Sequence, residues 1–259
     1  MSSPAAGADA LAPPRWQQVL PRQAVLTAGI VLLVAAVFPL VDLLVRYRLI
    51  VETLQFVVLA YAVPPLLVFG LPPRFRERLA GRLFGPRSGQ AGARMAKRHG
   101  RPLRARSWVM LGAFGLAAIL WRVPGVVDAI GRDVWLAFAE AACMVLTGVG
   151  LWLELTDSSA AVSAVSSPKK MAMAGVAMWS MWIAAYSLGF SRDIWYGAFL
   201  HHGAGSAGLI DEQEIASGLL FLFPFGVFVP VVVSWLIRWL RDEEGPEGEL
   251  RALISRMQR

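Results

Sequence analysis

The residues with most capacity for chemistry are polar side chains set within long apolar stretches: Asp42, Glu52, Gln55, Arg122 and Glu140. Such groups are costly in lipid, so each is expected either to pair with another or to serve a function. The first interpretation is a buried polar network of these five residues, in which Glu52, Arg122 and Glu140 join three helices as ion pairs. The second is an outward-facing site for a proton, a metal or another ligand. The residue types alone leave both interpretations open.

A second candidate site is the pair His201 and His202, which stands in a polar stretch with Asp193 and Glu212 nearby in sequence. Imidazole is a common metal ligand, so the pair predicts a weak outward-facing metal site. Adjacent side chains in an extended chain point in opposite directions, which makes two neighbouring histidines a poor chelate. A solvated loop without metal is the alternative.

The apolar stretches themselves are the elements that must position these residues. Six of them are close to the roughly 20 residues that a helix needs to cross a hydrocarbon core of about 30 Å. They cover Gln23–Val45, Ile50–Leu71, Trp108–Ile130, Val134–Leu155, Met171–Phe190 and Gly218–Leu240. With 56% hydrophobic and 17% charged residues, the chain is unlike a soluble domain. We therefore predict an all-α, polytopic membrane helix bundle with about six transmembrane helices.

Basic residues predict the orientation of these helices. The segment 73–107 is rich in cations, which are retained on the cytoplasmic side of a membrane. They are Arg74, Arg76, Arg78, Arg82, Arg87, Arg94, Lys97, Arg98, Arg101, Arg104 and Arg106. Both termini then lie in the cytoplasm, and the net charge of +7 reflects topology and attraction to anionic membrane lipids. Nucleic-acid binding is not expected, because no aromatic residues alternate with these cations as stacking platforms.

The predicted organisation has three parts. Residues 1–22 form a flexible cytoplasmic tail, and residues 23–240 form the membrane domain with the basic loop 73–107 and an outer loop 191–217. Residues 241–259 form a cytoplasmic amphipathic tail, because Leu250, Leu253, Ile254 and Met257 share one helical face. This tail is predicted either to lie on the inner leaflet or to be solvated.

Short motifs along the chain resemble the CtaG family of caa-type cytochrome c oxidase assembly factors. The stretch ETLQFVVLAYAVPPLLVFG keeps the pattern of Gln55, Pro64, Pro65, Leu66, Leu67 and Gly70. The motif Trp121–Arg122–Val123–Pro124 resembles the family's Trp-His-x-Pro. Glu140, Trp152 and the pair Glu212–Gln213 resemble later motifs in the same order. The resemblance covers about residues 25–240.

The departures from the family pattern concern its histidines. At those positions this chain has Glu52, Phe56, Arg122, Ala137 and Ala141. The resemblance implies copper as a cofactor, yet its expected ligands are missing, and a guanidinium cannot ligate a metal. We predict that Arg122, paired with Glu52 and Glu140, takes the place of the cation, and no cofactor is assigned to the chain.

The resemblance implies a non-enzymatic accessory or assembly protein for a haem–copper cytochrome c oxidase in a bacterial plasma membrane. Its partners would be membrane lipids, oxidase subunits or other assembly factors. The alternative is a small transporter or channel with an outward-facing site at Glu52, Arg122 and Glu140. An enzyme is not expected, because the chain has no HExxH or GxSxG motif.

Overall fold

The computed structural model describes residues 21–38, 48–84, 102–130, 132–156, 167–202 and 206–257. No strand occurs in these ranges. The elements are α2 (Arg22–Val37), α4 (Leu49–Val57), the π-helix η3 (Val58–Ala62), α5 (Val63–Gly70), α6 (Pro73–Phe84), α8 (Pro102–Leu120), α9 (Pro124–Ile130), α10 (Val134–Thr156), α11 (Ser167–Phe190), the 3-10 helix η4 (Gly197–His202) and α12 (Ser206–Met257). The predicted all-α class is confirmed.

Several of these helices are long and apolar enough to cross a membrane. Four qualify singly: Leu49–Gly70, Val134–Thr156, Ser167–Phe190 and Gly208–Arg241. The bent pair Ser107–Leu120 and Pro124–Ile130 makes a fifth when it is counted as one span. The first predicted span is described as α2, an apolar helix of 16 residues, and residues 39–47 after it lie outside the described ranges. The chain is thus a polytopic membrane protein, with four or five spans and the shorter α2 among its described helices.

Prolines shape the second and third spans. The rings of Pro64 and Pro65 remove two amide donors, and the turn before them, η3, is a π-helix in which the backbone is locally wider. Farther along, α8 ends at Leu120 and α9 begins at Pro124, with an angle of 74° between the two helices. Proline suits the first position of a helix and disfavours a helical residue before it, which explains where the break falls.

The last helix is longer than the sequence predicts. The expected outer loop 191–217 overlaps α12, because α12 begins at Ser206 and includes Glu212 and Gln213. Polar residues can remain helical there because they find protein partners. At its other end α12 continues to Met257 without a separate tail helix. Whether residues 241–259 lie on a leaflet stays a prediction.

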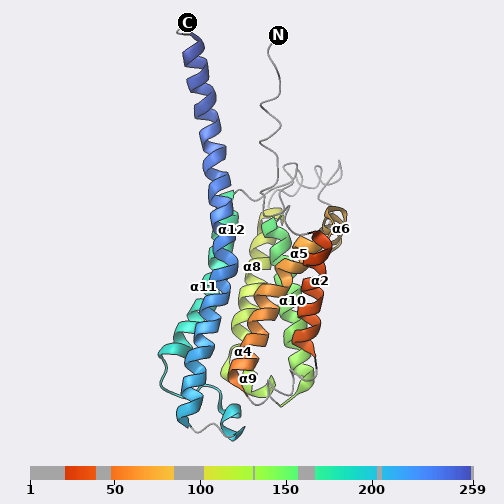
Figure 1. Cartoon of the computed structure of the whole chain (residues 1–259), viewed down its shortest axis with the longest axis vertical. Coiled ribbons are helices and arrows are strands. Elements are labelled where there is room, and N and C mark those ends of the chain that lie inside the picture. The colour runs from red at the N-terminus through yellow and green to blue at the C-terminus, as the bar shows by residue number, and fades with distance from the viewer. Residues whose placement is uncertain are drawn as a thin grey trace.

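The helices form two groups that meet in a shared core (Figure 1). Helices α11 and α12 run side by side, α12 also contacts α4, and α11 contacts α8. On the other side α2 packs on α5, and α10 packs against both α5 and α8. Tyr61 lies at the centre, with its ring edge-to-face against Phe114 and Phe228 at 5.7 and 5.9 Å. The buried apolar residues of all five spans thus form one main cluster.

Glycines allow two pairs of these helices to approach closely. A Cβ added at Gly70 would lie 2.5 Å from Leu26 Cα, so α5 and α2 touch backbone to backbone. A Cβ at Gly148 would lie 2.6 Å from Pro64 Cγ, where α10 crosses the start of α5. Small residues at helix contacts are typical of packing in membranes.

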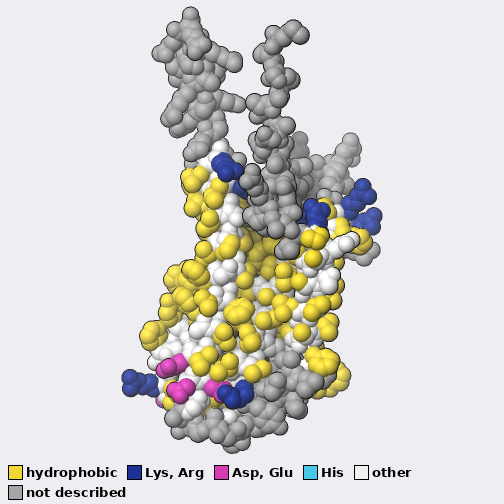
Figure 2. Space-filling model, viewed as in Figure 1, with side chains coloured by type: hydrophobic (Ala, Val, Ile, Leu, Met, Phe, Trp, Pro, Cys, Tyr) yellow, Lys and Arg dark blue, Asp and Glu magenta, His cyan; other side chains and the backbone are white. Residues whose placement is uncertain are grey.

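The side chains at the two ends of the bundle differ in character from those between the ends. Helix α6 and the far end of α12 lie at one end, while α9 and the start of α4 lie at the other (Figure 1). Hydrophobic side chains cover the surface between the two ends, and charged side chains gather at the ends themselves (Figure 2). This banded surface is what a lipid bilayer requires of a protein that crosses it.

Candidate functional site

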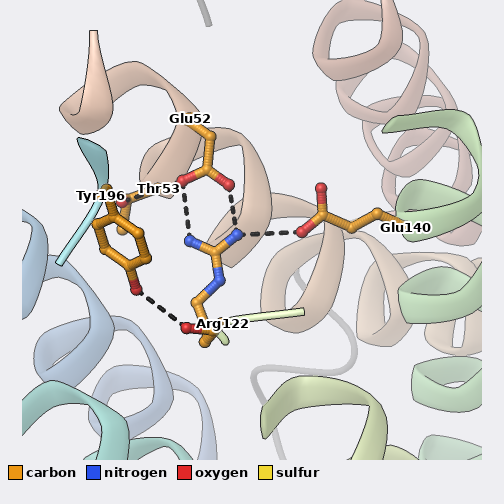
Figure 3. A network of polar contacts seen from close by, with 5 residues as sticks. All are labelled: Glu52, Thr53, Arg122, Glu140 and Tyr196. Atoms are coloured by element: carbon orange, nitrogen blue, oxygen red, sulfur yellow. Dashed lines mark hydrogen bonds and ion pairs between the residues drawn. The ribbon is translucent and has the colours of Figure 1, made fainter. Parts of the chain in front are cut away.

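Arg122 and Glu52 form a two-pronged ion pair in the core. The Arg122 Nη1 group donates to Glu52 Oε2 at 2.8 Å, and Nη2 donates to Glu52 Oε1 (Figure 3). Glu52 lies on α4, one turn from its start, and Arg122 lies in the break between α8 and α9. The planar guanidinium matches both carboxylate oxygens at once, which makes this the strongest kind of side-chain ion pair.

Glu140 of α10 completes the network from a third direction. Arg122 Nη2 also donates to Glu140 Oε1 at 3.0 Å. The three residues are 2%, 4% and 6% exposed, in the order Glu52, Arg122 and Glu140. A guanidinium with two ionised carboxylates leaves one negative charge in excess. The structure therefore brings together the three charged residues that sequence analysis grouped.

The break between α8 and α9 is what places Arg122 in the network. Trp121, Arg122 and Val123 form a turn, so the Arg122 carbonyl has no helical partner and accepts a hydrogen bond from the Tyr196 hydroxyl at 3.2 Å. Burial raises the pKa of Tyr196 to about 12, so this hydroxyl stays protonated at neutral pH. The Arg122 guanidinium also lies 4.0 Å from the centre of the Phe56 ring, a cation–π contact.

Glu212 and Gln213 of α12 hold the surrounding elements in place. Glu212 Oε2 accepts a hydrogen bond from the amide of Leu49, the first residue of α4, at 3.0 Å. Its other oxygen pairs with Arg48 Nε at 2.6 Å. An acidic side chain at a helix start satisfies a free amide and the positive end of the helix dipole. Glu212 therefore fixes the start of the helix that carries Glu52.

Gln213 ties down the connection that carries Tyr196. Its Oε1 accepts a hydrogen bond from the Trp195 amide at 2.8 Å, and its Nε2 donates to the Asp193 carbonyl at 3.1 Å. Nearby, Asp128 of α9 accepts a hydrogen bond from the Ala198 amide at 3.0 Å. Side chains from α9 and α12 thus set the position of Tyr196, and Tyr196 in turn holds the Arg122 backbone.

Gln55 does not belong to the network, although it was predicted to. Its side chain turns towards α2 and donates from Nε2 to the Ala36 carbonyl at 2.7 Å. A residue three positions after Glu52 on a helix is offset from it by about 60° around the helix axis and by about 4.5 Å along it, and this offset brings Gln55 next to α2. Gln55 instead satisfies a carbonyl near the end of α2.

Several other predicted site residues, or their side chains, lie outside the part of the chain that the structure describes. Asp42, Lys97, Arg98 and Arg101 are outside the described ranges, as are the side chains of His201, His202, Arg82, Arg104 and Arg106. The histidine metal site and most of the basic loop therefore remain predictions. Of the basic loop, Arg74, Arg76 and Arg78 are described, on α6.

A second buried polar group was missed by sequence analysis. The Ser107 hydroxyl on α8 donates to Glu154 Oε2 on α10 at 3.0 Å. On α11, Lys170 is 2% exposed, and its Nζ lies 4.2 Å from the centre of the Trp235 ring on α12. The available signal was the position of Glu154 inside the fourth apolar stretch, whereas Lys170 directly precedes the fifth stretch and resembles the cations that mark the cytoplasmic side of a membrane.

The described donor set does not fit a copper ion. The Arg122 guanidinium occupies carboxylate oxygens of Glu52 and Glu140 that a metal would need, and it cannot itself be a ligand. Among the described residues, no group of three or more His, Cys, Asp or Glu side chains could hold a metal. The two carboxylates are therefore better matched to the Arg122 guanidinium, a cation that the protein itself supplies, than to a bound metal ion.

Comparison with known families decides the affiliation of the chain. Residues 7–242 match the family described as cytochrome c oxidase caa3 assembly factor (Caa3_CtaG). The chain belongs to this family. Comparison with curated proteins gives no match, and comparison with solved structures gives none either. The resemblance predicted from short motifs is confirmed.

The Caa3_CtaG motifs gather around the polar network in this structure. Arg122 and Glu140 are members of it, and Glu212–Gln213 hold the two segments that carry Glu52 and Tyr196. Pro64 packs against Gly148 at the crossing of α5 and α10. Motifs that are far apart in the sequence thus serve one neighbourhood of the fold.

Proposed function

We propose that this Caa3_CtaG protein is a non-enzymatic accessory protein for the assembly of a caa3-type cytochrome c oxidase. It acts in the bacterial plasma membrane through contacts between helices, with oxidase subunits or other assembly factors as partners. The observation that carries this proposal is the match of residues 7–242 to the Caa3_CtaG family, and the binding of both carboxylates by Arg122 favours a function of this network without a metal. The polar network then serves to hold α4, α8, α9 and α10 in a fixed arrangement.

A second candidate, a small transporter or channel, is favoured by one feature of the same network. Two carboxylates face one guanidinium, so a proton or small cation could balance the excess negative charge. Glu140 is the member of the pair with only one contact to Arg122. In this candidate function, the charge of Glu140 is required for activity.

One experiment separates the two functions. A strain that lacks this protein is complemented with wild type or with Glu140→Gln, which keeps a hydrogen-bond acceptor for Arg122 but removes the charge. Terminal oxidase activity and the haem a and copper content of membranes are then measured, together with the amount of this protein. We expect the deletion to lower all three oxidase readouts and both forms to restore them.

Two other results would contradict these expectations. If the deletion leaves oxidase activity and metal content unchanged, the assembly function is wrong. If Glu140→Gln is present at wild-type levels but fails to complement, the charge itself is needed. Proton or cation flux in vesicles that contain the purified protein would then identify the second candidate.

A further inference from the structure

Helix α6 changes the direction of the chain at the end of the second span. The chain leaves α5 at Gly70, and Pro72 starts the new helix, because its carbonyl accepts hydrogen bonds from the amides of Phe75 and Arg76 at 2.9 and 3.1 Å. In Figure 1 α6 is seen nearly along its own axis, whereas α5 runs along the bundle. Helix α6 therefore lies across the end of the bundle and does not extend it.

The sequence of α6 gives it two adjacent stripes of opposite character. An arginine occurs at every fourth position, at Arg74, Arg78 and Arg82. An apolar residue directly follows each of them, at Phe75, Leu79 and Leu83. Residues four apart share a helix face, so a basic stripe runs alongside an apolar one. Four arginines and only Glu77 as an acidic residue give the helix a strong positive charge.

The described side chains show how these stripes meet the bundle. Leu79 is half-buried and packs against the main apolar cluster, whereas Phe75 is 57% exposed. Arg74 and Arg78 are exposed, and the Arg78 guanidinium lies 6.0 Å from the centre of the Phe75 ring. One apolar residue thus anchors α6 to the protein, and the other points away with the arginines beside it.

The position of α6 explains its exposed aromatic ring. Figure 2 shows basic side chains at this end, at the border of the hydrophobic surface. A helix in the headgroup plane can bury an apolar side chain at the acyl boundary while its cations reach phosphate groups. In water alone the same arrangement would leave more than half of the Phe75 side chain exposed to solvent.

We propose that α6 is a binding site for anionic phospholipid, in which Arg74 and Arg78 contact the headgroup phosphate and Phe75 enters the acyl boundary. The arginines of α6 are complementary in charge to anionic headgroups at the edge of the apolar surface, and this binding does not depend on the function in oxidase assembly. The occupant is the membrane leaflet itself, because the exposed aromatic ring gives no advantage in binding a free phosphate ion.

The test uses the full chain in neutral detergent with equal amounts of phosphatidylglycerol and phosphatidylcholine. Native mass spectrometry then counts the retained lipids. We expect wild type to prefer phosphatidylglycerol and Arg74→Gln/Arg78→Gln to lose the preference, by about fivefold in affinity for each arginine. Arg74→Lys/Arg78→Lys should keep most of it, because the charge remains.

The matched control removes the same charge from the opposite end. Arg132 and Arg192 are exposed and stand next to the ends of α9 and α11, and Arg132→Gln/Arg192→Gln should keep the preference. A preference lost equally in both double variants would mean that only net charge matters. That result, or a wild-type protein without preference, would overturn the proposal.

Discussion

Arg122 is held from several directions, through both its guanidinium and its backbone carbonyl. Its side chain binds Glu52 of α4 and Glu140 of α10, its charge lies over the Phe56 ring, and its carbonyl accepts from Tyr196. A buried ion pair adds little net stability over apolar packing, but breaking one is costly because a charge is left alone. Arg122 is therefore a residue whose loss should affect the entire bundle.

We predict that Arg122→Ala lowers the free energy of unfolding by about 3–5 kcal/mol, because two carboxylates remain buried without a cation. Arg122→Lys should fall between this variant and wild type, since an ammonium keeps the charge but not the forked contact with Glu52. Chemical denaturation in detergent, followed by tryptophan fluorescence, measures both. The control is Arg132→Ala at an exposed position; equal stability of the two alanine variants would contradict the prediction.

An unpaired charged side chain in the hydrocarbon core has a high free energy, so charged residues in neighbouring spans are expected to pair. For this reason Glu52, Arg122 and Glu140 could be grouped from the sequence. Tyr196 could not be added, because its contact to Arg122 joins residues 74 positions apart through an irregular connection. Gln55 was wrongly grouped, since hydropathy indicates the depth of a residue but not the helix it faces. Lys170 was missed for a similar reason: a cation near a span end usually indicates topology.

At the scale of elements, the contact between α2 and α5 depends on the absence of side chains. Gly70 faces the backbone of Leu26, and Gly29 faces Leu66, so both helices contribute a glycine. Most contacts of α2 are with α5 and with η3 before it, and Gln55 of α4 adds one hydrogen bond to the Ala36 carbonyl. Its attachment therefore rests on a close approach that a methyl group would prevent.

Gly70→Ala should destabilise the protein by about 1–3 kcal/mol, the usual cost of overpacking, because the new Cβ would lie 2.5 Å from the Leu26 backbone. Gly112→Ala is the matched control, because no atom lies within 4 Å of its added Cβ. This control should be neutral or more stable by up to about 1 kcal/mol through helix propensity. Thermal unfolding in detergent compares them, and a Gly70→Ala protein as stable as Gly112→Ala would refute the close approach.

Some element boundaries follow from the sequence and others do not. Pro124 predicts an interruption of the third span, and the structure has a break there. The start of α12 was misplaced because apolar composition begins near Gly218, whereas the helix begins at Ser206. Hydropathy marks the part of a helix that lies in lipid, and polar turns that bind other protein segments extend beyond it.

At the scale of the whole molecule, hydropathy alone was sufficient to predict the all-α membrane fold, because only long helices satisfy their backbone groups in lipid. The arrangement of the helices could not be predicted in this way. Pairing of α11 with α12, or of α2 with α5, depends on shape and on single glycines. The orientation in the membrane remains a prediction from the basic residues.

We predict that the end with α6 faces the cytoplasm. Single cysteines at Arg78 and Arg132, in a Cys143→Ser background, place one thiol at each end of the bundle, at exposed positions. With a maleimide that does not cross membranes, intact cells should be labelled at position 132, and position 78 should react only after lysis. The opposite pattern would reverse the topology.

The length of α12 has a mechanical consequence. Its 52 residues make a rod about 78 Å long, roughly twice what a bilayer needs. Near its beginning Glu212 and Gln213 bind α4 and the 193–195 segment, and from there α12 packs along α11 as far as Trp235. Beyond Trp235 about 33 Å of helix remain, so a change of tilt of about 10° in this part, small beside the range of transmembrane helices, would move its far tip by about 6 Å. The part of α12 beyond Trp235 would thus turn a small change in the angle of the helix into a larger displacement of its end.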